Sequence, residues 1–228
     1  MDKVVIEFFH DVICSFCFPM SYRMRELKKI YPEVEIVHRS FALVKADSDF
    51  DLMFGSRKAA KAEIMSHWAH ANANDDLHRF NIEGMKNADF LFPGSMKGLR
   101  ACKAAYFIGG DVLYWDLFDA LQNALFVQNL NIEEDAVMEN CVENVGINVE
   151  EWRQYFLRDD TKKAVEEDLK AASNYGIYGA PCLVINGKQK ISGAQPLSTV
   201  IEAIRNVKAS DSSAGASCKL VDGEMKCD

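Results

Sequence analysis

The chain has 228 residues, of which 49% are hydrophobic and 11% aromatic, enough to bury a core as one domain, or as one domain that carries a large insertion. Its formal net charge of −8 argues against nucleic acid or an anionic membrane as a partner. The first apolar run is interrupted by Glu7 and His10, so we expect no signal sequence, and no stretch reaches the length of a membrane helix. These features predict a protein of the reducing cytoplasm.

Seven cysteines are many for that compartment. Where thiols stay reduced, closely spaced cysteines more often serve catalysis or metal binding than structural bridges. One close pair, Cys14 and Cys17, lies near the N-terminus, and a second, Cys218 and Cys227, lies near the C-terminus. Three single cysteines lie between the pairs: Cys102, Cys141 and Cys182.

The first 44 residues predict a strand, a helix and a second strand. Residues 4–9 form an apolar run typical of a strand buried on both faces. Residues 15–30 have apolar positions at helical spacing, and residues 34–41 alternate as a strand does. The Cys14–Cys17 pair therefore falls where the first strand runs into the helix.

The middle of the chain predicts helices and no strand. Gly109-Gly110 and Gly146 indicate helix ends within this region. The expected helices are 57–73, 96–109, 113–128, 133–145, 149–156 and 161–174.

Strand signals return at residues 181–185, followed by Asn186-Gly187, a strong signal for a two-residue hairpin turn. Residues 188–191 can then pair back antiparallel. A final helix is expected from Pro196 to about Val207, because proline suits a first helical turn.

Residues 208–217 have the composition of a linker, and a terminal hairpin is expected after it. A two-residue turn at Asp222-Gly223 places Cys218 opposite Cys227, with Cα atoms about 4.5 Å apart, within disulfide range. One interpretation is a structural bridge worth about 3 kcal/mol when oxidised. The other is a second redox pair that reaches Cys14 and Cys17 through the flexible linker.

The position of Cys14 explains a nucleophilic role. We expect it at or next to the helix N-cap, where free N–H groups and the helix dipole stabilise a thiolate. Cys17 lies three residues later and less exposed, so it can resolve a mixed disulfide. A zinc site would need a second ligand pair nearby, and the spacing of Cys218 and Cys227 is unlike a zinc knuckle, so no metal is expected.

Three segments in this order resemble the DsbA family of the thioredoxin superfamily, and more closely its FrnE-like branch. They are residues 11–14 (Asp-Val-Ile-Cys), 176–181 (Gly-Ile-Tyr-Gly-Ala-Pro) and 191–196 (Ile-Ser-Gly-Ala-Gln-Pro). The resemblance implies a thiol–disulfide oxidoreductase with a thioredoxin-like α/β fold and a large all-helical insertion. The expected parts are a thioredoxin-like domain (1–44 and 160–207), a helical insertion (45–159) and a C-terminal linker with a cysteine hairpin (208–228).

The resemblance also implies a substrate site. Pro181 would follow a cis peptide bond beside the cysteine pair, and Ala180 would bind extended substrate backbone as a sheet edge binds a strand. Ser15 and Phe16 stand where the family usually has Pro-Trp or Pro-His, which predicts a centre less oxidising than DsbA. The expected partners are proteins with disulfides or dithiols. No bound cofactor is expected, although glutathione or another thiol can be a co-substrate.

Other side chains have weaker assignments. Either Glu7 or Asp11 is a candidate acceptor for the Cys17 proton, with a loop or capping role favoured for Asp11. Cys182 is expected to pack into the sheet, as are Cys102 and Cys141 into helices. The aromatic rings near Phe90 and Phe92 are candidates to line an apolar groove. His67, His70 and His78 are near one another in sequence, but no carboxylate completes a metal set.

Two other functions stay open. One is a glutathione-dependent isomerase or transferase of the same fold, which would not need Cys17. The other is a redox-regulated chaperone or binding module, which predicts client binding without turnover.

Overall fold

The computed structural model describes residues 3–213, 218–221 and 224–227. Its strands are β1 (Val5–His10), β2 (Glu35–Ser40), β3 (Cys182–Ile185), β4 (Gln189–Ser192), β5 (Cys218–Val221) and β6 (Glu224–Cys227). Its helices are α1 (Cys17–Ile30), α2 (Asp47–Phe54), α3 (Arg57–Asn74), α4 (Ile82–Asn87), α5 (Ser95–Phe126), α6 (Asp135–Asn144), α7 (Val149–Leu157), α8 (Asp159–Asn174) and α9 (Leu197–Ser213).

The central sheet has the strand order β2-β1-β3-β4. β1 and β2 are parallel and joined by α1, whereas β3 runs antiparallel to both β1 and β4. Phe9 pairs with Cys182, so the loop that enters β3 lies beside the loop that leaves β1. This register brings two segments that are far apart in sequence to the same end of the two central strands.

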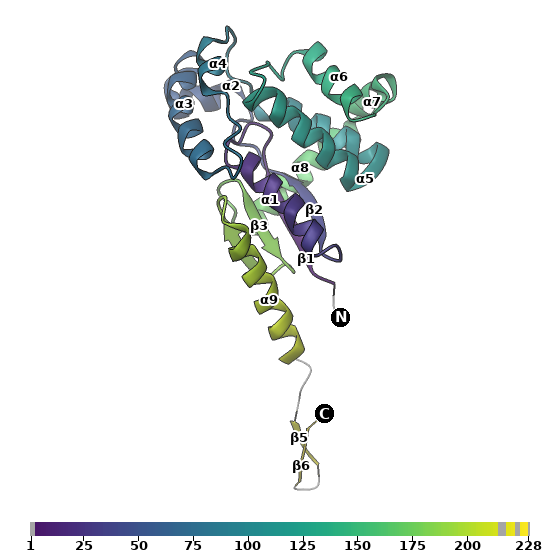
Figure 1. Cartoon of the computed structure of the whole chain (residues 1–228). Coiled ribbons are helices and arrows are strands. Elements are labelled where there is room, and N and C mark those ends of the chain that lie inside the picture. Colours follow the sequence, from purple (N-terminus) through teal and green to yellow (C-terminus); the bar gives the residue numbers. More distant parts are fainter. Residues whose placement is uncertain (1–2, 214–217, 222–223, 228) are drawn as a thin grey trace.

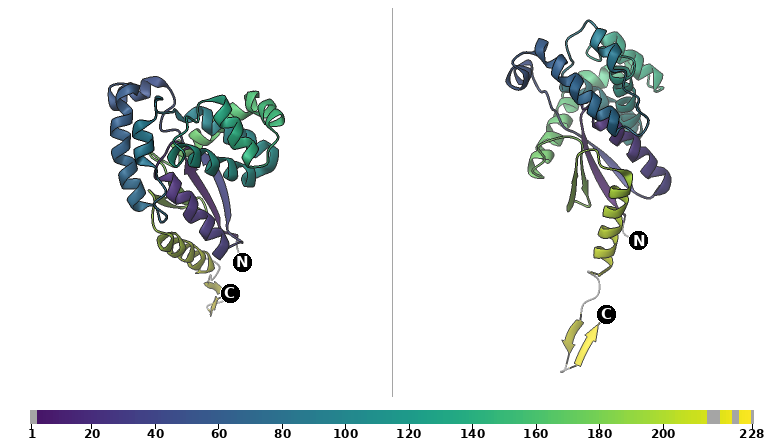
Figure 2. Two further views of the ribbon diagram at one scale, coloured as in Figure 1. Left: turned by 45° about the horizontal axis from the view of Figure 1, so that its top comes forward. Right: turned by 60° about the vertical axis from the view of Figure 1, so that its left-hand side comes forward.

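Helices cover both faces of the sheet (Figures 1 and 2). On one face, Phe9 and Val184 pack with Ala172 of α8. On the other, Ile6 and Phe8 belong to the main core with α1, α5 and α9. The thioredoxin-like α/β fold with a large helical segment between β2 and β3 is therefore confirmed. The residue boundaries of its parts stay a prediction.

The helical segment differs from the expected pattern in two ways. The two helices expected at 96–109 and 113–128 are assigned as one, α5, but Gly109 and Gly110 inside it have non-helical backbones and mark the expected break. Gly110 has φ 65°, which glycine adopts without strain. The short helices α2 and α4 were not expected, because each has fewer than three turns of apolar periodicity.

The C-terminal part also differs from expectation. Helix α9 runs to Ser213, so residues 208–213 are helical and not linker. The remaining expected linker, 214–217, and the turn at Asp222-Gly223 lie outside the described residues. The strands on either side of that turn pair with Cys218 opposite Cys227, the register that the turn predicts.

The turn between β3 and β4 has Asn186 at φ 48° and Gly187 at φ 67°. The pairing of Ile185 with Gln189 leaves three residues in the loop, one more than the two-residue turn expected. Within the described part of the chain, no helix is both long and apolar enough to cross a membrane.

Candidate redox site

The Cys14–Cys17 pair lies in two consecutive turns between β1 and α1. The N–H of Cys14 donates to the carbonyl of Asp11 at 3.1 Å, and the N–H of Cys17 donates to the carbonyl of Cys14 at 3.0 Å. Helix α1 begins at Cys17 with Phe16 as its N-cap, so Cys14 lies two residues before the cap. The expectation of Cys14 at or next to the N-cap was wrong, because the first turn after β1 closes between Cys14 and Cys17.

The two thiols differ in access. Cys14 keeps 4% of its surface exposed, and Cys17 keeps none. Burial raises the pKa of the Cys17 thiol well above its ordinary value, and the neighbouring Cys14 thiol raises that pKa further. This asymmetry suits an attacking Cys14 and a resolving Cys17 that stays protonated until it is needed.

The loop before β3 lies directly against Cys14. The Cys14 thiol donates to the carbonyl of Ala180 at 3.4 Å. The peptide bond between Ala180 and Pro181 is cis, the geometry that the family resemblance implies. The antiparallel pairing of β1 and β3 is what brings this loop to the thiol.

Asp11 is buried at the base of the same loop. Its carboxylate accepts from the Leu43 N–H at 2.7 Å, the Ser95 hydroxyl at 2.6 Å and the Ile13 N–H at 3.3 Å. Burial raises the pKa of Asp11 to about 6, although these donors act in the opposite direction. Asp11 is therefore both a loop-organising residue and a carboxyl group that can exchange a proton near neutral pH.

A cavity of about 290 Å³ opens beside Cys14. Ser15, Phe16 and Ala180 are among the residues that line it. The rest of the lining is mostly apolar and includes Leu43, Phe50, Met53, Phe54, Trp68 and Phe92. Of the two aromatic residues singled out in the sequence, only Phe92 lines this cavity. The spacing of Phe50, Met53 and Phe54, i, i+3 and i+4, was a signal for α2 that the sequence reading missed.

The family model described as a DSBA-like thioredoxin domain matches residues 5–205. The chain belongs to this family. No curated protein matches its sequence significantly.

Solved structures show the same fold as this DSBA-like chain at low identity. A candidate protein disulfide isomerase from Nitrosomonas europaea has a TM-score of 0.74 at 17% identity, over 92% of this chain and 99% of that one. The cytosolic disulfide reductase DsbM from Pseudomonas aeruginosa, also solved with GSH, has a TM-score of 0.70 at 14% identity, over 88% of this chain. The match spans 98% of the DsbM chain, or 99% in the structure with GSH. A 2-hydroxychromene-2-carboxylate isomerase has a TM-score of 0.68 at 14% identity, with 92% and 98% covered.

The other candidate proton acceptor, Glu7, is not near Cys17 in this DSBA-like fold. Its side chain pairs with Arg39 at 2.8 Å and accepts from the Tyr175 hydroxyl at 2.6 Å, on the face of the sheet that α8 covers. An unexpected polar pair, His10 and His38, lies on the opposite face with ring nitrogens 3.0 Å apart. Burial, followed by nearby positive charge, lowers the pKa of both rings well below the ordinary value.

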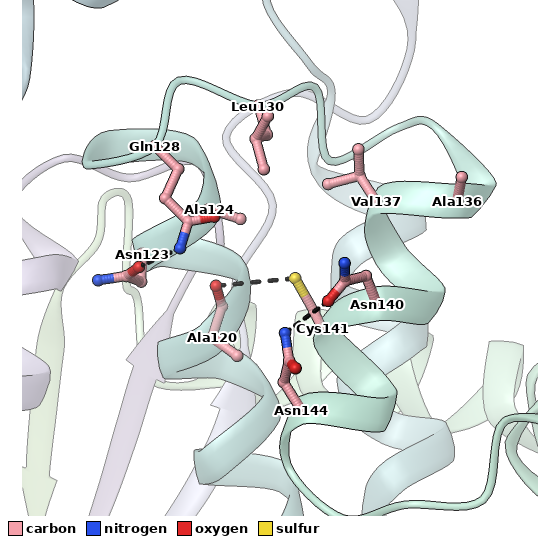
Figure 3. A pocket seen from close by; sticks show the side chains of 10 residues that line it. All are labelled: Ala120, Asn123, Ala124, Gln128, Leu130, Ala136, Val137, Asn140, Cys141 and Asn144. Atoms are coloured by element: carbon pink, nitrogen blue, oxygen red, sulfur yellow. Dashed lines mark hydrogen bonds between the residues drawn. The ribbon is translucent and has the colours of Figure 1, made fainter.

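The three single cysteines are buried thiols. Cys182 has its side chain in the apolar cluster under α8, as expected. Cys141 lies at a hollow of about 480 Å³ between α5 and α6, where its thiol donates to the Ala120 carbonyl at 3.8 Å (Figure 3). That hollow is larger than the cavity beside Cys14, but neither a charged side chain nor an expected site residue lines it, so we assign it no catalytic part.

The histidines that lie near one another in sequence have separate surroundings. His67 lines the cavity beside Cys14, whereas the His78 ring bonds the Asn72 carbonyl at 2.7 Å. Among the residues that the structure describes, no group of three or more His, Cys, Asp or Glu side chains is placed to hold a metal ion.

Proposed function

We propose that this protein is a thiol–disulfide oxidoreductase that acts on disulfide or dithiol groups of proteins, with Cys14 as nucleophile and Cys17 as resolving cysteine. The observation that carries the proposal is the contact of the Cys14 thiol with the Ala180 carbonyl, directly before the cis-proline, while Cys17 lies buried beside it. Membership in the DSBA-like family supports general thiol–disulfide chemistry.

The reaction is a pair of exchanges. The Cys14 thiolate attacks one sulfur of a substrate disulfide, so a Cys14–substrate bond forms and the other substrate sulfur leaves as a thiolate. Cys17 then loses its proton and attacks the Cys14 sulfur, which releases the second substrate thiolate and forms the Cys14–Cys17 disulfide. Oxidation of a substrate dithiol is the same sequence reversed.

Asp11 is our candidate for the group that accepts the proton of Cys17. Cys17 and Asp11 interact electrostatically, and the raised pKa of Asp11, about 6, matches an acceptor that works near neutral pH. Proton loss from Cys17 is otherwise opposed by complete burial. The partner that resets the pair is proposed to be glutathione or another thiol: two thiols reduce the Cys14–Cys17 disulfide and leave as one disulfide.

The cavity beside Cys14 indicates what flanks the reacting sulfur. Its lining by Phe50, Trp68 and Phe92 favours an apolar side chain next to the substrate cysteine. Ala180, which lines the cavity, is proposed with Pro181 to hold extended substrate backbone. A cytoplasmic location is part of the proposal, supported by the likeness to a cytosolic disulfide reductase.

Insulin reduction with glutathione as electron donor tests the proposal, together with the measured potential of the Cys14–Cys17 pair. We expect Cys14→Ser to abolish turnover and Cys17→Ser to trap a mixed disulfide on Cys14. Full activity of Cys17→Ser would instead favour a glutathione-dependent isomerase or transferase. Absence of turnover with several thiol donors would favour a redox-regulated binding protein.

We further propose that Cys218 and Cys227 form a second redox pair that exchanges with Cys14 and Cys17. The register of β5 and β6, which pairs Cys218 with Cys227, supports a pair able to close. Replacing both by serine should change the potential or the turnover of the Cys14–Cys17 pair. Unchanged kinetics would leave the terminal pair a structural bridge.

A further inference from the structure

Gln122, in the second half of α5, reaches the loop that carries the redox cysteines. Its side chain is completely buried. The Nε2 group donates to the carbonyl oxygens of Asp11 and Cys14, each at 3.3 Å. Those two carbonyls already accept the N–H groups of Cys14 and Cys17. One amide therefore ties both turns of the redox loop to the helical insertion.

The first turns of α5 approach the same loop closely. Ser95 donates to the Asp11 carboxylate and accepts from the Val44 N–H at 2.9 Å. At Gly98 an added Cβ would lie 2.5 Å from a methyl carbon of Val12, so only glycine allows this approach. Both parts of α5, before and after Gly109 and Gly110, therefore contact the loop.

The orientation of the Gln122 amide is fixed by its two acceptors, because an amide oxygen turned toward two carbonyl oxygens would be repelled by both. Its Oε1 is then buried with no donor among the residues that the structure describes. A buried acceptor without a donor destabilises the folded protein. Methionine would fill similar space without that cost, so packing alone does not explain an amide here.

We propose that Gln122 is a positioning residue that stabilises the thiolate of Cys14, because its amide group sets the positive ends of its N–H dipoles against the two loop carbonyls and fixes their direction. The positive end of each N–H dipole offsets part of the negative potential that a carbonyl oxygen produces at the Cys14 sulfur. The inference rests on the proposed function only in taking Cys14 as the reactive thiol.

Three titratable groups of the described residues share a loop or a cavity with Cys14. Cys17 lies beside it, Asp11 lies at the base of the loop, and His67 lines the same cavity. Gln122 itself does not titrate, so replacing it by methionine leaves the set of charges unchanged. A change in the pH dependence of Cys14 would then report the lost hydrogen bonds.

The test measures the rate of Cys14 alkylation by iodoacetamide against pH in a Cys17→Ser background, with and without Gln122→Met. We expect the rate profile of Gln122→Met to move to higher pH, with a threefold to tenfold lower rate below the midpoint, since one pKa unit is about tenfold in thiolate. With Cys17 present, the dithiol should become less favoured by the same factor, and tenfold corresponds to a potential about 30 mV more negative.

Gln128→Met is the matched control, because Gln128 is exposed just beyond the end of α5 and bonds only Asn123. It should leave both measurements unchanged. Gln122→Asn is the second variant: it keeps the amide but shortens its reach, and should shift the profile in the same direction as methionine.

A folded Gln122→Met or Gln122→Asn protein with the parent's alkylation profile and potential would overturn the inference. A loss of unfolding free energy without a shift in either would show a purely structural role. If the parent pair does not cycle between dithiol and disulfide, the proposed function fails instead, while the alkylation profile of Cys14 still tests Gln122.

Discussion

Two buried aspartates in this molecule are held in opposite ways. Asp168 of α8 is paired with Lys103 at 2.5 Å and Arg39 at 3.1 Å, and it accepts the Ser40 N–H at 2.7 Å. Asp11 has only N–H and O–H donors, and no ion pair links it to a Lys or Arg in the described part of the chain. Two cations pair with the first carboxylate, whereas burial without such a partner raises the pKa of the second to about 6.

The difference separates a structural site from a reactive one. The carboxylate between two cations anchors β2 to α5 and α8. A carboxyl group surrounded by neutral donors can gain or lose a proton at small cost. The His10–His38 pair lies between the two regions, since His10 precedes Asp11 and the His38 carbonyl accepts from Lys103 at 3.3 Å.

The largest effect is expected at the structural aspartate. Asp168→Asn leaves the Lys103 ammonium buried without its partner, so the free energy of unfolding should fall by about 3–5 kcal/mol. Urea unfolding at pH 7 measures it, and adding Lys103→Met should recover part of the loss. The folded variant should keep the parent's rate of mixed-disulfide resolution. If the free energy of unfolding fell by less than about 1 kcal/mol, Asp168 would not be the structural anchor that distinguishes it from Asp11.

Asp11→Asn should act on the reaction. We expect the resolution of the Cys14 mixed disulfide to slow by about tenfold to a hundredfold, because the Cys17 proton loses its acceptor. In the parent the rate should rise as pH increases through about 6, where Asp11 loses its proton, and this step should vanish in the variant. Quenched-flow trapping of the mixed disulfide gives both rates; a retained step would exclude Asp11 as the acceptor.

The histidine pair predicts a smaller, pH-dependent effect on stability. Both rings have a lowered pKa when folded, so their contribution is complete above the unfolded pKa of about 6.5 and is lost as the pH falls below it. Between pH 6.5 and 5.5 the two rings together should cost about 1–3 kcal/mol. Asp11 acts in the opposite direction, since its raised pKa removes stability as the pH rises through about 6.

His38→Gln isolates the histidine contribution. Urea unfolding of the parent and the variant at several pH values should show a shallower loss of stability toward acid in the variant, while the Asp11 contribution is common to both. Parallel curves for the two proteins would mean that the folded rings titrate normally.

The sequence predicted the features that depend on residues close together in the chain. The strand-to-helix position of Cys14 and Cys17, the break at Gly109-Gly110 and the pairing of Cys218 with Cys227 follow from residues close together in the chain. The surroundings of the thiols do not, because they are assembled from distant segments. Gln122 is 108 residues from Cys14. A single glutamine among the core residues of a helix forms no sequence pattern that would predict its contact with the redox loop.

Asp11 shows the same difference between features set by local sequence and features set by tertiary packing. Its place before the cysteine motif suggested a loop or capping residue, and its hydrogen bonds to Leu43 and Ile13 agree with that. Its pKa depends on how completely Ser95 and the rest of α5 bury it, a quantity set by tertiary packing. The sequence showed that a carboxyl group lies next to the cysteine motif, but not how far its pKa is raised.

The close approach at Gly98 has a consequence for protein engineering. Because the helix and the loop touch where even one methyl group would not fit, a larger residue on one side needs a matching change on the other. We therefore expect a graft of the Ser15-Phe16 spacer, or of the whole Cys14–Cys17 motif, to carry over only part of its redox behaviour. The transferable unit is the loop together with α5, two pieces separated in the chain and joined in space.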